Sequence, residues 1–321
     1  MIDQKGIVFL FPGQGSQRVG MGLDLVETVP DARKIFDKAD EILGFSLSKL
    51  CFEGPEEELK HTQVTQPALF VHSMATLAAM EIQPEEGSAV AGHSLGEWTA
   101  AVASGAIDFE DGLRLVRRRG ELMEKAGAEQ SGTMAAILGL SRDTIEEVCA
   151  GTPGSVVVAN LNSPKQIVIS GEVAAVEAAM EKAREAGAKR VIPLSVGGAF
   201  HSPLMGSAAE GLKEALDGVF VRRARVPIMA NVSGRFVQEP ADIRKAMTDQ
   251  LLNAVQWDAS MRNLLEWGGR LFLEIGSGRV LSGLQRQIHG EDLSLAVGDV
   301  SSLVVWRTRS QDLQSAKGTS R

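Results

Sequence analysis

The pentapeptide Gly92-His93-Ser94-Leu95-Gly96 limits the possible folds of this 321-residue chain more than any other segment. It follows a short apolar run at residues 89–91 and precedes a helix-like stretch at residues 97–102. A serine framed by glycines between a strand and a helix is the pattern of a nucleophile elbow. The glycines leave room for a tight turn that exposes the serine hydroxyl and aims backbone N–H groups at a developing oxyanion. The pattern predicts an α/β fold in which Ser94 is the nucleophile.

The apolar patterns outside the elbow predict alternating strands and helices, and therefore an α/β fold with a parallel sheet. One expectation concerns Pro67, which would open an apolar helix that runs to about residue 80. The other predicted elements are strands at residues 6–11 and 270–275 and helices at residues 31–43 and 109–126.

A different order of elements begins near residue 132, where the pattern is βαββαβ, as in ferredoxin-like domains. We therefore predict a hydrolase-like large domain at residues 1–130 and 197–305, with a ferredoxin-like small domain inserted at residues 131–196. The polar residues 306–321 are expected to form a disordered tail.

Composition and charge exclude several classes of protein. A net charge of −8 argues against nucleic acid as the main partner. The two cysteines, Cys51 and Cys149, lack the spacing of a metal site, and their scarcity is typical of a reducing compartment. We find no signal-peptide pattern and no apolar run long enough to span a membrane. We therefore expect a cytoplasmic protein without a metal or a membrane segment.

A serine hydroxyl needs a neighbouring base, and the chain offers five histidines. His201 lies in a loop beyond a predicted strand, among small residues, where catalytic groups commonly gather. His93 is beside the nucleophile and should point away from it, whereas His72 and His289 are expected to be structural or exposed. We predict that His201 is the base. No acidic residue stands out as a third member, and a backbone carbonyl could orient the imidazole equally well.

An oxyanion hole requires two donors. The N–H of Leu95, the residue after the nucleophile, is the first candidate. Gln14, between two glycines in the loop after the first strand, is the second. The alternatives for that loop are a plain turn or a phosphate cradle, but it lacks the ending of a P-loop.

Arg119 lies in the middle of an apolar stripe when residues 115–126 are placed on a helical wheel. Met123 belongs to the same stripe, whereas Arg114, Arg117 and Arg118 fall on the other side. A buried guanidinium needs an anionic partner. Either an internal carboxylate or the carboxylate of a substrate could supply it.

Taken together, these residues resemble the malonyl-CoA:acyl-carrier-protein transacylases and the acyltransferase domains of polyketide synthases. The resemblance covers about residues 6–300. It is carried by residues 11–17, 65–68, 92–97, 119–120, 198–205, 255–257 and 274–276. It implies transfer of a malonyl group from malonyl-CoA to the phosphopantetheine thiol of an acyl carrier protein, by ping-pong chemistry at Ser94 and His201. A trans-acting polyketide acyltransferase and a serine thioesterase or esterase are the alternatives.

The resemblance also assigns roles to individual residues. Arg119 would bind the malonyl carboxylate, and the backbone carbonyl of Gln256 would orient His201. Phe200 would leave little space for an α-methyl group, a preference worth about 1–3 kcal/mol. The remaining assignments are Gln14 and Leu95 for the oxyanion hole, Gln63 and Met123 at the substrate, and Asn160 or Asn162 at the rim. The family implies no resident cofactor and a monomer, and Lys189–Arg190 and Arg222–Arg225 are candidate docking clusters for the carrier.

Overall fold

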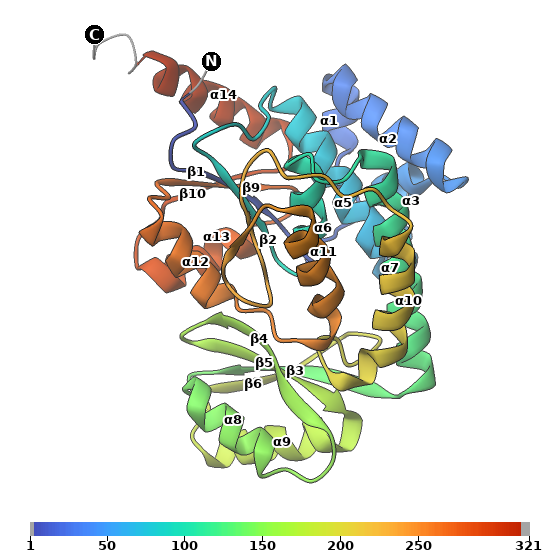
Figure 1. The fold of residues 1–321 in the computed structure, drawn as a ribbon, viewed down its shortest axis with the longest axis vertical. Coiled ribbons are helices and arrows are strands. Elements are labelled where there is room, and N and C mark those ends of the chain that lie inside the picture. Colours follow the sequence, from blue (N-terminus) through green and yellow to red (C-terminus); the bar gives the residue numbers. More distant parts are fainter. Residues whose placement is uncertain (1–2, 316–321) are drawn as a thin grey trace.

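The computed structural model describes residues 3–315 and contains two separate β-sheets (Figure 1). The larger sheet has the strand order β10-β9-β1-β2-β7-β8, and its pairs are parallel except for β7 with β8. The smaller sheet has the order β4-β5-β3-β6 and is antiparallel. The strands are β1 Ile7–Phe11, β2 Ala89–Gly92, β3 Gly132–Leu138, β4 Val156–Ser163, β5 Gln166–Glu172, β6 Arg190–Leu194, β7 Ile228–Met229, β8 Phe236–Val237, β9 Leu271–Ile275 and β10 Ser294–Val297.

Helices cover both faces of the larger sheet, as Figure 1 shows. None of them, within residues 3–315, is long and apolar enough to cross a membrane. The α-helices are α1 Leu23–Thr28, α2 Pro30–Leu43, α3 Leu47–Glu53, α4 Glu56–Lys60, α5 Thr62–Ala79, α6 Leu95–Ala103, α7 Phe109–Glu129, α8 Arg142–Ala150, α9 Val173–Glu185, α10 Gly206–Asp217, α11 Pro240–Asp249, α12 Trp257–Glu266, α13 Val280–His289 and α14 Val300–Ser315. Two short 3-10 helices are η1 Pro203–Met205 and η2 Gln250–Leu252.

Strand β1 lies in the middle of the larger sheet, and all five of its residues are buried. Its side chains alternate between the two faces, as the period of a strand requires. Phe9 and Phe11 belong to the core cluster that contains residues of α5, α6 and α7. Val8 and Leu10 belong to a second cluster with residues of α12 and α13. A continuous apolar run is therefore what this strand needs, since both its faces are covered.

The smaller sheet and its two helices form the βαββαβ unit expected from the sequence, a ferredoxin-like arrangement. Helices α8 and α9 bury their apolar residues against the sheet in a core of their own. Backbone hydrogen bonds join this unit to the larger one. The N–H of Leu161 donates to Val255 O and the N–H of Val255 donates to Ala159 O, both at 2.9 Å.

The expectation that Pro67 opens its helix is wrong, because α5 begins five residues earlier, at Thr62. Proline lacks an N–H, so inside a helix it leaves the carbonyl four residues before it without its usual donor. Here that carbonyl belongs to Gln63, and Arg117 Nη1 of α7 donates to it at 2.9 Å. A long-range side-chain contact, which local sequence patterns do not reveal, therefore replaces the missing helix bond.

The expected disordered tail is also wrong for residues 306–315, which belong to helix α14, so the large unit continues beyond residue 305. The rest of that predicted tail, residues 316–321, lies outside the described residues. Trp306 is 1% exposed, and its indole N–H donates to Met80 O at 3.1 Å. Trp306 and the equally buried Leu303 anchor a helix whose other residues are mostly polar.

Candidate active site

The backbone of the elbow is tightly packed where β2 ends and α6 begins. A Cβ atom on Gly96 would lie 1.9 Å from Phe11 O, and one on Gly92 would lie 2.0 Å from the backbone of Gly96. Only glycine therefore fits these two positions. Ser94 between them has φ 49° and ψ −102°, a conformation that non-glycine residues rarely adopt. The turn follows the geometry that the sequence pattern predicts.

The structure brings Ser94 and His201 together although they lie 107 residues apart. Ser94 Oγ is 2.8 Å from His201 Nε2, and His201 Nδ1 is 2.9 Å from the backbone oxygen of Gln250. The expected carbonyl of Gln256 is therefore wrong as the orienting group. Its oxygen accepts instead from the side chain and the N–H of Ser260, in the first turn of α12. Gln250 carries no motif, so the sequence offered no signal for it.

The hydrogen bonds determine the tautomer of His201. A carbonyl oxygen can only accept, so Nδ1 carries the proton and the Ser94 hydroxyl donates to Nε2. Burial of the imidazole, aided by the positive charge of Arg119, lowers the pKa of His201 to about 3. The imidazole is therefore neutral at neutral pH and can accept the serine proton.

Arg119 is 1% exposed, as the helical wheel predicts, and its guanidinium lies beside the nucleophile. Its Nη2 donates to Ser94 Oγ and to Gln250 Oε1, both at 3.0 Å, and Nη1 donates to Gln66 Oε1 at 2.8 Å. The Nε atom is buried and has no hydrogen-bond partner within residues 3–315.

All direct partners of this guanidinium are neutral. No carboxylate forms an ion pair with Arg119 in the described part of the chain. Burial lowers the pKa of Arg119 to about 9, and the negative charge of Glu97 opposes that shift. The arginine is thus charged at neutral pH and has no contacting counterion.

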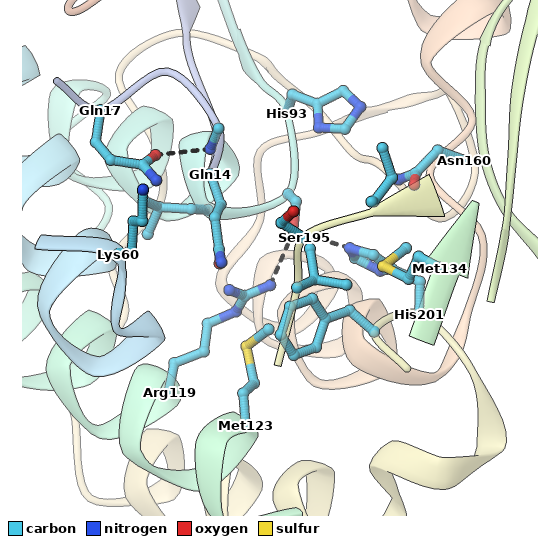
Figure 2. A pocket seen from close by; sticks show the side chains of 16 residues that line it. Gln14, Gln17, Lys60, His93, Arg119, Met123, Met134, Asn160, Ser195 and His201 are labelled. Carbon is cyan, nitrogen blue, oxygen red and sulfur yellow. Dashed lines mark hydrogen bonds between the residues drawn. The ribbon is translucent and has the colours of Figure 1, made fainter. Parts of the chain in front are cut away.

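A pocket of about 290 Å³ opens over the dyad (Figure 2). Figure 2 shows Arg119 and Met123 on one side of it, and Asn160, Met134 and His201 on the other. The predicted site residues that line this pocket are Gln14, Ser94, Leu95, Arg119, Met123, Phe200 and His201. Lining residues for which the sequence predicted no role include Gln17, Lys60, Met134 and the segment 194–196. Met134 lies on β3, and the segment 194–196 begins at the end of β6; both strands belong to the small domain.

Two glutamines near Arg119 have different positions. Gln63, expected at the substrate, does not line the pocket and is instead bonded to Arg117 and Glu124. Gln66, one turn further along α5, is the one that contacts Arg119. The expectation is wrong because Arg117 and Glu124 of α7 hold the Gln63 side chain outside the pocket lining.

The two candidate asparagines of strand β4 also differ. Asn160 lines the pocket, whereas Asn162 Oδ1 lies 2.8 Å from Nε2 of the elbow histidine, His93. The His93 ring is half-buried and lies 5.3 Å from the Trp257 ring, so it does point away from Ser94 as expected.

The predicted oxyanion donors lie at the pocket as well. Leu95 is the first residue of α6, where N–H groups have no acceptor within the helix. Gln14 Nε2 lies 3.5 Å from Thr62 Oγ1 and the side chain is half-buried. Within residues 3–315, no group of three or more His, Cys, Asp or Glu side chains is arranged to hold a metal ion.

Comparisons with known proteins by family model, by sequence and by structure all point to the same family. Residues 8–301 match the model of the acyl transferase domain family. The malonyl CoA-acyl carrier protein transacylase of Bacillus subtilis is 47% identical over 300 residues, which are 92% of this chain and 95% of that protein. The crystal structure of an acyl-carrier-protein S-malonyltransferase from Bartonella henselae has a TM-score of 0.91 at 40% identity, covering 95% of this chain and 99% of the other. A malonyl-transacylase solved with its type II polyketide acyl-carrier protein has a TM-score of 0.90, 40% identity and coverages of 95% and 100%.

Proposed function

Since this chain belongs to the acyl transferase domain family, we propose that it transfers a malonyl group from malonyl-CoA to the phosphopantetheine thiol of an acyl carrier protein. The observation that carries the proposal is the buried guanidinium of Arg119, 3.0 Å from Ser94 Oγ and without a contacting counterion in residues 3–315. An acyl group on Ser94 that ends in a carboxylate would supply that counterion. A buried charge pair with two parallel hydrogen bonds is the arrangement that an arginine fork favours.

The first half-reaction forms a malonyl-serine. His201 Nε2 accepts the Ser94 proton while Oγ attacks the thioester carbonyl. The N–H of Leu95 and the amide of Gln14 are proposed to stabilise the oxyanion. The C–S bond then breaks, and the proton on Nε2 passes to the departing thiolate of coenzyme A.

The second half-reaction runs the same steps in reverse. The thiol of the carrier arm gives its proton to His201, and its sulfur attacks the malonyl ester. Ser94 Oγ leaves and recovers the proton from Nε2. The dyad and the two substrates account for every proton and electron pair that moves in these steps, so the proposal includes no resident cofactor.

The carrier must approach near the mouth of the pocket, and we propose Lys189–Arg190 as part of its docking surface. Arg190 begins β6, and Leu194 at the end of that strand lines the pocket. At about 3.3 Å per residue, the strand places the basic pair roughly 13 Å along the chain from the lining residue. The other candidate cluster is less available, since Arg222 pairs with Asp108 and Arg223 with Glu239. The similarity to a transacylase of polyketide synthesis means that a carrier of fatty-acid or polyketide synthesis would fit the proposal.

Two further proposals concern the state of the protein in the cell. We propose a cytoplasmic location, supported by Cys51 and Cys149, which are both free and buried. We propose a monomer, in which one chain supplies the dyad, Arg119 and both oxyanion donors, so that the site needs no partner subunit.

Trapping the acyl-enzyme tests this function. After incubation with malonyl-CoA, peptide mass mapping should find a malonyl ester on Ser94, and an acyl carrier protein should discharge it. Ser94→Ala should abolish the adduct, whereas Ser195→Ala, at another serine of the same pocket, should retain it. Rapid loss of the ester to water without a carrier would indicate a thioesterase or esterase. Absence of any adduct would contradict acyl transfer.

A further inference from the structure

Glu97 is a buried carboxylate three residues after the nucleophile, and the mechanism above does not use it. It is 2% exposed and forms no ion pair within residues 3–315. Its Oε1 accepts from the N–H of Asn231 at 3.1 Å, and its Oε2 accepts from Nε2 of Gln250. Both oxygens therefore point at N–H donors, and the two donors belong to residues that contact Ser94.

Asn231 holds the N–H side of Ser94. Its Oδ1 accepts from the Ser94 N–H at 2.7 Å, and its Nδ2 donates to Gly92 O at 2.7 Å. Since a backbone N–H can only donate and a carbonyl can only accept, these two bonds determine which way the amide faces. The bond from the Asn231 N–H to Glu97 holds the backbone that carries this amide.

Gln250 holds the carbonyl side of Ser94. Its Oε1 accepts from Trp98 Nε1 at 3.1 Å and from Arg119 Nη2 at 3.0 Å, and both of these groups are donors only. Its Nε2 must therefore face acceptors, and it donates to Ser94 O at 2.9 Å as well as to Glu97. The carboxylate of Glu97 thus keeps the Gln250 amide in the orientation that grips Ser94 O.

The Ser94 carbonyl belongs to the same peptide group as the N–H of Leu95. A trans peptide is planar, so its C=O and N–H point in opposite directions. The Ser94 oxygen is held on the side of Gln250 and Glu97. The Leu95 N–H, the proposed oxyanion donor, therefore points in the opposite direction, toward the pocket. The backbone N–H of Glu97 also donates to Ser94 O, at 3.1 Å, which strengthens the same grip. In addition, the Gln250 backbone oxygen orients His201.

We propose that Glu97 is a positioning residue for acyl transfer, whose carboxylate orients Asn231 and Gln250 so that they clamp the peptide groups on both sides of Ser94. The inference rests on the proposed function for its reaction, but the clamp itself concerns the reactivity of Ser94 toward any electrophile. Glu97 touches no substrate and acts through the two amides.

Glu97→Gln is the sharpest test because it preserves size and removes one acceptor. Whichever way the new amide turns, its NH2 faces an N–H donor of Asn231 or Gln250. Misplacing a reacting group by a small distance can lower rates by about two orders of magnitude, so malonyl and acetyl loading should both fall roughly 10- to 100-fold. The fall should appear in kcat with KM little changed. The rate at which a fluorophosphonate modifies Ser94 should fall by a similar factor. Because that probe carries no acyl group, its result holds even if malonyl transfer is not the natural reaction.

Glu274→Gln is the matched control. Glu274 is a fully buried carboxylate on β9 that accepts from the N–H groups of Leu281 and Ser282, and it does not line the pocket. It should lower thermal stability and leave the fluorophosphonate rate unchanged. A wild-type rate for Glu97→Gln, or equal losses in the two variants, would overturn the proposal.

If Glu97→Gln does not fold, Asn231→Ala removes half of the clamp while leaving the carboxylate bonded to Gln250. It should slow the fluorophosphonate and both acyl donors alike. An unchanged fluorophosphonate rate in folded Asn231→Ala would refute the clamp.

Discussion

Replacing Arg119 by alanine should separate malonyl transfer from acetyl transfer. The guanidinium is buried, lies 3.0 Å from Ser94 Oγ, and its Nε has no partner in the described chain. Two hydrogen bonds from a charged donor to the malonyl carboxylate, at about 1.5–3 kcal/mol each, amount to about 3–6 kcal/mol. Since about 1.4 kcal/mol corresponds to a factor of ten, malonyl loading should fall roughly 10²- to 10⁴-fold. Acetyl loading has no carboxylate contact to lose, but it loses the contacts of Nη2 with Ser94 Oγ and Gln250 Oε1, so it should fall by about tenfold, less than malonyl loading.

The assay is single-turnover acylation of Ser94 from malonyl-CoA and from acetyl-CoA, compared as a ratio. Arg118→Ala is the control, because it removes the same charge from the same helix at an exposed side chain. Arg119→Lys keeps the charge without the planar fork and should give an intermediate ratio. Equal loss of malonyl and acetyl loading in Arg119→Ala would refute the assignment of this arginine to the acyl carboxylate.

Three other predictions concern pH, stability and selectivity. Burial raises the pKa of Glu97 to about 7, against the opposing charge of Arg119, while His201 stays neutral down to about 3. A protonated Glu97 would turn an O–H toward an N–H donor and loosen the clamp, so the acylation rate should rise with pH through about 7. Glu97→Gln should remove that rise. A rise that persists in the variant would contradict the assignment. Trp306→Ala should lower the free energy of unfolding by about 3–5 kcal/mol in denaturant titrations, with an unchanged ratio of malonyl to acetyl loading. Phe200→Ala should raise methylmalonyl loading relative to malonyl by roughly tenfold in competition assays, and no change would mean that the ring does not limit the pocket.

The local parts of the site could be predicted from the sequence because residues close together in the chain determine their geometry. The two glycines that the elbow requires lie within five residues of each other. The burial of Arg119 could be predicted from the spacing of apolar residues in its own helix. The role of His201 as the base could be predicted by elimination, because the chain has only five histidines. In each case a short pattern determines the geometry.

The long-range parts could not be predicted in the same way. The carbonyl that orients His201 belongs to Gln250 and not to Gln256, because any residue has a carbonyl and only the fold decides which one arrives. Pro67 lies inside α5, and the donor that it cannot supply to Gln63 O comes from Arg117, 50 residues away. Helix α14 is held by the buried side chains of Leu303 and Trp306, and the Trp306 indole reaches Met80 O, 226 residues away.

Ser94 and His201 are two of the three non-glycine residues with positive φ in residues 3–315, the third being Glu81. Such conformations cost about 1–3 kcal/mol each, whereas a whole domain is stable by only about 5–15 kcal/mol. The evolutionary consequence concerns Ser94, where selection for stability alone would favour glycine because the small side chain has little packing to lose, whereas loss of the buried His201 ring would leave a cavity. A descendant that has lost its chemistry, survives as a binding partner and carries glycine at position 94 should therefore be more stable than the catalytic protein. Retention of serine at position 94 in this conformation would mark the continued demand for catalysis.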